Sequence, residues 1–70
     1  MVPLPMADIG NENIIRKVGG SPEVKKHLED LGFVPGAIVR LVNVIGDNVI
    51  VNVKESRIAI NSDLARRIMI

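Results

Sequence analysis

The chain has 70 residues, no cysteine and a formal net charge of +1, from nine basic and eight acidic side chains. This length suits one small domain, so we expect a single domain over residues 1–70 that contains neither disulfides nor thiolate metal ligands. The balanced charge, and the presence of one Phe without Trp or Tyr, argue against a dedicated nucleic-acid binder.

The amino-terminal segment lacks the features of a signal peptide, since it has no positively charged start, no long apolar core and no small-residue cleavage site. No apolar run approaches the roughly 20 residues that a membrane-spanning helix needs. We therefore expect a cytoplasmic protein without direct membrane insertion.

Two early prolines predict an irregular start, because each fixes φ and removes a hydrogen-bond donor. Residues 5–8 are compatible with one helical turn. The β-branched run over residues 14–18 then predicts a first strand, and the glycine pair that follows terminates it.

A Ser-Pro-Glu sequence at residue 21 predicts the start of a helix, with serine as N-cap and proline at the first helical position. Val24, Leu28 and Leu31 then recur at the spacing of one helix face. The pattern predicts one amphipathic helix over about residues 21–31.

The helix is expected to end at Gly32, because glycine readily adopts the left-handed conformation that helix ends favour. Pro35-Gly36 predicts a tight turn directly before a long β-branched strand over residues 38–45. Apolar and polar residues do not alternate cleanly along that strand, which indicates a β-bulge or a strand bent enough to serve two sheets.

The remaining elements are predicted to be short. They are a hairpin turn at 46–48, strands at 49–53 and 57–60 with a turn at 54–56 between them, a one-turn helix near 62–65, and a final strand at 68–70. Asn61-Ser62-Asp63 is a second capping signal, which opens the one-turn helix. This order predicts a mainly β fold, a small and strongly bent five-stranded barrel with one amphipathic helix plugging one side. The expected core consists of Ile14, Val18, Val24, Leu28, Leu31, Val39, Leu41, Val49, Val51, Ile58, Ile60, Leu64 and Ile68.

Candidate catalytic or metal-binding residues are few. His27 is the only histidine, with Glu23 four residues before it and Asp30 three residues after it, but no H-x-x-x-H or E-x-x-H spacing is present. A partly exposed helical histidine is the favoured interpretation. Because no nucleophile stands beside a base, we expect neither an enzyme nor a bound cofactor.

One pattern extends over most of the chain, with L-x-x-L-G-[hydrophobic]-x-P-G at the helix end, then an R-I-A-L-like strand, then an alanine and a terminal I-x-V. The residues that match it are Leu28, Leu31, Gly32, Pro35, Gly36, Arg57, Ala59 and Ala65. In this pattern the sequence resembles the FeoA family of ferrous iron transport accessory proteins. The match extends over nearly the whole chain from Met6 onward.

The resemblance implies an SH3-like barrel that works in the cytoplasm with FeoB, the membrane Fe(II) transporter that carries a G-protein domain. A similar domain forms the carboxyl-terminal part of iron-dependent repressors of the DtxR type. Two positions depart from the family pattern. His27 stands where the family often has arginine, and the turn at 54–56 lacks the usual glycine.

A partner surface is expected from exposed basic and apolar side chains. The candidate partner-binding residues are Lys25, Lys26, His27, Phe33 and Ile45, of which the last two are expected to form an exposed apolar patch. Self-association is compatible with the sequence.

Direct ligand binding is the alternative class of function. One version is an Fe(II)-responsive module that binds Fe(II) or another divalent metal weakly through His27 and nearby carboxylates. The other is a small RNA-binding barrel that uses four basic residues, namely Arg16, Lys17, Arg66 and Arg67.

Overall fold

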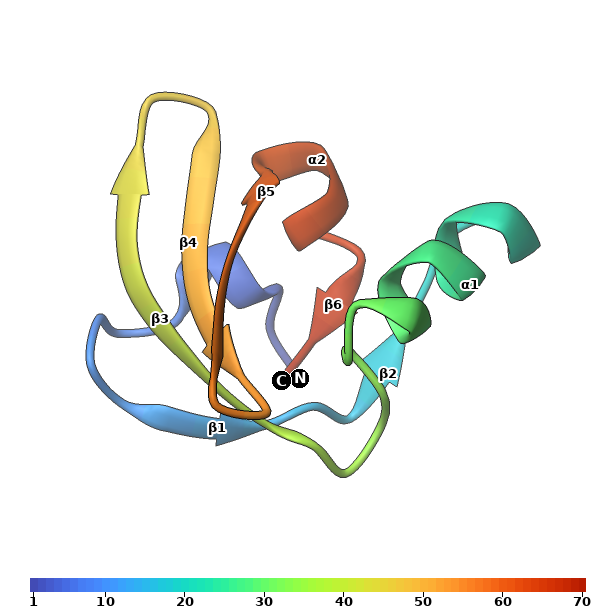
Figure 1. The fold of residues 1–70 in the computed structure, drawn as a ribbon, viewed down its shortest axis with the longest axis horizontal. Helices are drawn as coiled ribbons and strands as arrows, with labels where there is room; N and C mark the ends of the chain where they lie inside the picture. The colour runs from blue at the N-terminus through green and yellow to red at the C-terminus, as the bar shows by residue number, and fades with distance from the viewer.

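Two antiparallel sheets form a small, strongly bent barrel (Figure 1). In the computed structural model, which describes residues 1–70, the strands are β1 (Glu12–Ile14), β2 (Lys17–Val18), β3 (Ile38–Ile45), β4 (Asn48–Val53), β5 (Ser56–Asn61) and β6 (Ile68–Met69). One sheet has the strand order β1-β3-β4-β5, and the other pairs β2 with β6. The prediction of a mainly β fold with one amphipathic helix is confirmed.

The first predicted strand is divided between the two sheets. β1 ends at Ile14, and the next two residues carry the chain across: the Ile15 N–H donates to the Ala37 carbonyl (2.9 Å) and the Arg16 N–H to the Met69 carbonyl (2.8 Å). Ile15 is buried and Ile14 is 54% exposed. The expectation that Ile14 lies in the core was therefore wrong, because a shift of one residue along a strand reverses which face a side chain occupies.

The helices are η1 (Leu4–Met6), α1 (Pro22–Asp30) and α2 (Ser62–Ala65). Both predicted capping signals are confirmed. The Ser21 hydroxyl accepts a hydrogen bond from the Val24 N–H (3.3 Å), and the Asn61 side-chain oxygen accepts one from the Leu64 N–H (2.8 Å). None of these helices combines the length and the apolar character needed to cross a bilayer.

The carboxyl end of α1 closes in a Schellman motif. The Phe33 N–H donates to the Leu28 carbonyl and the Gly32 N–H to the Glu29 carbonyl, both at 2.9 Å, while Gly32 has a φ of +106°. The motif brings Phe33 back under the helix, where both Phe33 and Leu28 are fully buried. The expectation that Phe33 forms part of an exposed patch was therefore wrong.

A type II turn follows directly. The Ala37 N–H donates to the Val34 carbonyl (3.0 Å) across Pro35 and Gly36, and Gly36 has the positive φ (+91°) that the third position of this turn requires. The predicted Pro-Gly turn is thus confirmed. β3 begins directly after it and has the bounds predicted from the sequence.

Strands β3, β4 and β5 form a meander joined by two short turns. The register of β3 against β4 shifts between Leu41 and Asn43, which confirms the predicted bulge. Along β4 the three valines are buried, while Ile50 and Asn52 on the other face are half-buried.

The turn between β4 and β5 has an unusual backbone. Lys54 and Glu55 both have positive φ values (49° and 64°), as a two-residue type I′ turn requires, although neither is glycine. A Cβ added at Gly32 would lie 3.4 Å from Cδ of Lys54, so the lysine stem runs alongside the end of α1. The turn therefore adopts the left-handed backbone that glycine favours, although this chain lacks the glycine that the family usually has there.

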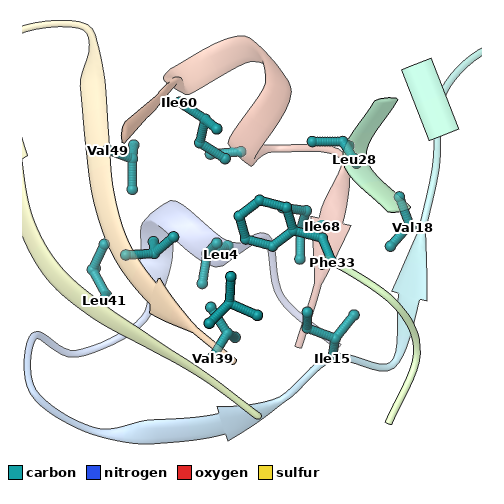
Figure 2. Packing of buried hydrophobic residues seen from close by; sticks show 13 residues of the cluster. Leu4, Ile15, Val18, Leu28, Phe33, Val39, Leu41, Val49, Ile60 and Ile68 are labelled. Carbon is teal, nitrogen blue, oxygen red and sulfur yellow. The ribbon is translucent and has the colours of Figure 1, made fainter. Parts of the chain in front are cut away.

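The core is entirely apolar and surrounds the Phe33 ring (Figure 2). Its members are Leu4, Ile15, Val18, Leu28, Phe33, Val39, Leu41, Val49, Val51, Val53, Ile60, Ala65 and Ile68. Four residues expected in the core, Val24, Leu31, Ile58 and Leu64, are partly buried against it. The sequence analysis did not place Leu4, Ile15, Phe33, Val53 or Ala65 there.

The two ends of the chain pair with each other. Val2 and Ile70 exchange two backbone hydrogen bonds (3.0 and 2.9 Å), and Pro3 forms a bridge with Met69. The ends consequently lie side by side at the second sheet (Figure 1).

Replacing Phe33 with Ala is expected to lower the free energy of unfolding by about 3–5 kcal/mol, because it removes the ring around which the core packs. Urea denaturation monitored by circular dichroism measures the change. Ile45→Ala is the control, since Ile45 is 56% exposed and its truncation should change stability by less than about 0.5 kcal/mol. Equal effects of the two substitutions would contradict the placement of Phe33.

Replacing Glu55 with Gly is expected to raise the free energy of unfolding by about 0.5–1 kcal/mol, because relief of the left-handed conformation exceeds the added chain entropy of glycine. Ser56→Gly, in the adjoining strand, should instead lower it by a similar amount. Thermal melts of the two variants beside the parent chain test the turn geometry, and a loss of stability in Glu55→Gly would refute it.

Candidate functional site

The outer face of the four-stranded sheet carries a row of polar side chains. Strand register places Glu12, Arg40, Asn52 and Arg57 opposite one another in that order, one from each strand. Nη2 of Arg40 lies 3.5 Å from Oε2 of Glu12. Arg57, at the far end of the row, forms no ion pair and is exposed.

A shallow open groove of about 550 Å³ lies beside this row. Its lining consists of Arg40 and Asn52 from the strands and of Gly36, Ala37, Ile38, Lys54 and Glu55 from the turns and the start of β3. The groove therefore combines two cationic side chains, one carboxylate and backbone groups on a solvent-accessible surface.

Apolar side chains are exposed at both ends of β3. Ile14 and Ile38 are direct cross-strand partners, 54% and 55% exposed. Ile45, beside the β3–β4 turn, is 56% exposed. Ile14 and Ile38 thus form a small exposed apolar patch next to the polar row.

The predicted partner-binding residues do not form one surface. Lys25, Lys26 and His27 are exposed on α1, whereas Ile45 lies at the β3–β4 hairpin on the other side of the barrel (Figure 1). Phe33 is inside the core. A partner role for the three helix residues and for Ile45 remains a prediction.

The donors around His27 do not fit a built metal site. His27 is exposed on the last turn of α1, and the chain nowhere brings together three or more histidine or carboxylate side chains in an arrangement that holds a metal ion. A closed site needs three or four such ligands.

The basic residues of the RNA-binding alternative lie around the second sheet. The Gly19 N–H donates to the Arg67 carbonyl (2.7 Å), so the segment after β2 runs beside the α2–β6 turn, and Arg66 pairs with Asp63 at 3.8 Å. The only phenylalanine of the chain is buried and is not accessible for stacking on a base, and the chain has no Trp or Tyr. No structural observation favours this alternative.

Neither Arg40 nor Asn52 was singled out in the sequence analysis, and Arg57 was noted only within the family pattern. Their alignment depends on the exact register of three strands, including the shift at the bulge. The period-2 pattern of β4 places Asn52 on the outer face, and this is the one signal that sequence alone offers.

The two small sheets, the strongly bent meander and the single helix that covers one side define an SH3-like barrel with an open, polar outer face. Within this class, the FeoA domain model matches residues 2–70, and the chain belongs to the FeoA domain family. A search of curated protein sequences finds no significant match.

Solved structures agree with this assignment. A crystal structure of an iron uptake regulatory protein (FeoA) is 31% identical, with 97% of this chain and 90% of that chain covered and a TM-score of 0.88. Stenotrophomonas maltophilia FeoA, complexed with zinc and described as a prokaryotic SH3 domain protein, is 27% identical over 99% of this chain and 87% of that chain, with a TM-score of 0.82. A manganese-dependent transcriptional repressor, 13% identical over 94% of this chain and 38% of its own length with a TM-score of 0.85, shares the fold.

Calorimetric titration of this chain with Mn(II) or Zn(II) is expected to show only weak binding, and His27→Ala should change it by less than about twofold, because a lone exposed imidazole offers too few ligands. His27→Gln serves as the matched control of similar size. Tight stoichiometric binding that disappears in both variants would contradict this account of α1.

Proposed function

We propose that this chain is a non-catalytic accessory protein of ferrous iron uptake that docks on the cytoplasmic portion of a FeoB-type Fe(II) transporter. The observation that carries the proposal is the FeoA family match over residues 2–70. Two of its structural relatives are described as an iron uptake regulatory protein and as a candidate ferrous iron transport activating factor. A cytoplasmic location belongs to the same proposal, since that is where the transporter's G-protein domain lies.

The outer face of the four-stranded sheet supports docking. It presents the unpaired Arg57, the groove beside Arg40, and the exposed pair of Ile14 and Ile38. Polar groups of this kind set the specificity and encounter rate of an interface, and exposed aliphatic groups add burial when a partner covers them.

The chemistry of the groove also suits binding. Its ionisable side chains, Arg40, Lys54 and Glu55, are all exposed. Catalytic acids, bases and nucleophiles are usually activated by burial or by a strong local field, which an exposed position does not provide. We therefore assign recognition to this face.

The proposal is tested by titrating the 15N-labelled chain with the purified cytoplasmic portion of the transporter. We expect saturable binding, with shifts concentrated on the outer face of the sheet because that face holds the exposed groups. Deletion of the chain should reduce Fe(II) uptake in cells, and re-expression should restore it.

The Phe33→Ala variant controls the cell experiment, since a chain without its core should not restore uptake. Absence of binding at high micromolar concentration, together with normal uptake after deletion, would overturn the proposed function.

A further inference from the structure

The sheet has an unpaired edge along β5. This strand pairs only with β4 and stands last in the strand order. Val53 and Ser56 flank a two-residue turn, so they form a hydrogen-bonded pair, and the backbone groups of Arg57 and Ala59 consequently point away from β4. No hydrogen bond from elsewhere in the chain reaches the N–H or C=O of either residue.

The polar row ends at this edge with a positive charge that has no partner. The row begins with the ion pair of Glu12 and Arg40 and continues through Asn52 to Arg57, which has no carboxylate beside it. A further strand added next to β5 would contribute the fifth member of the row. Opposite charges directly across a strand pair are favourable, so an acidic side chain fits that position.

The next cross-strand row on the same face, formed by Ile50 and Ala59, favours an apolar side chain on an added strand. Ala59 lies opposite the half-buried Ile50, and its methyl group leaves the outer face shallow at the exposed edge. A larger aliphatic side chain on an added strand would cover Ala59 and extend the apolar surface of Ile50.

We infer that β5 is the docking edge of this protein, where an extended segment of the partner adds to the sheet with an acidic side chain opposite Arg57 and an aliphatic one opposite Ala59. In antiparallel pairing the segment reads aliphatic-x-acidic from its amino end. Main-chain hydrogen bonds supply the affinity and the two outer-face side chains supply the specificity, as in other cases of β-strand addition. The identity of the partner as the transporter rests on the function proposed above.

A second copy of this chain fits the edge less well. If two β5 strands pair about Ala59, Arg57 faces Asn61 of the partner subunit, and both arginines still lack a carboxylate. A cation on an exposed edge also discourages pairing between identical strands. The charge pattern therefore favours a different protein.

The test uses the full chain and the transporter's cytoplasmic portion. Ala59→Pro removes the outward N–H while leaving the β4 ladder intact. Ala59→Val keeps that N–H, so its effect on binding measures the side-chain contact at this position alone. Arg57→Glu reverses the unpaired charge, and Arg16→Glu makes the same change at an exposed site away from β5. Far-UV circular dichroism and thermal melts establish that each variant is folded.

Ala59→Pro and Arg57→Glu are each expected to weaken binding by roughly tenfold or more, and Ala59→Val by less than Ala59→Pro, whereas the Arg16→Glu control stays within about twofold of the parent chain. Amide hydrogen exchange at Arg57 and Ala59 should slow when the partner is bound. If Ala59→Pro does not fold, the comparison of Arg57→Glu with Arg16→Glu decides the question.

Parent-like binding by both edge variants would overturn this inference and leave the proposed function standing. If the parent chain does not bind the transporter portion at all, both this inference and the proposed function fail. Sedimentation that shows self-association of the parent chain, abolished by Ala59→Pro, would replace the partner protein with a second copy.

Discussion

The reversal of the chain at the end of α1 determines how the helix meets the two sheets. Two backbone hydrogen bonds, from Phe33 to Leu28 and from Gly32 to Glu29, turn the chain back under its own helix. They place the largest side chain of the core between the helix and both sheets (Figure 2). In a chain of this length one aromatic ring is a large share of the buried apolar volume, so the position of this ring determines how the barrel closes.

Local signals allowed much of the fold to be predicted. The Ser21 and Asn61 caps and the Pro35-Gly36 turn all depend on side chains within a few residues of the feature they determine. The break in alternation along β3 correctly indicated a bulge. In each case a stereochemical preference acts over one turn or one strand, and the surrounding fold agrees with it.

Features that depend on tertiary geometry were missed. Phe33 follows a helix-ending glycine, and its direction depends on the Schellman hydrogen bonds, which composition does not reveal. Ile15 lies in the core in place of the predicted Ile14, because the chain leaves the first sheet between these two residues. The row from Glu12 to Arg57 exists only when four strands are in register, so no short motif identifies it. The surface is thus harder to predict than the core, since it depends on the relative placement of strands that are far apart in sequence.

Pairing of the two chain ends has a consequence for how this protein folds. Val2 and Ile70 exchange two backbone hydrogen bonds and Pro3 forms a bridge with Met69, so the contacts that extend the second sheet join residues separated by almost the entire sequence. The meander of β3, β4 and β5 needs only short loops. Because closing a longer loop costs more entropy, we expect the hairpins to assemble before the seam between the two ends is joined.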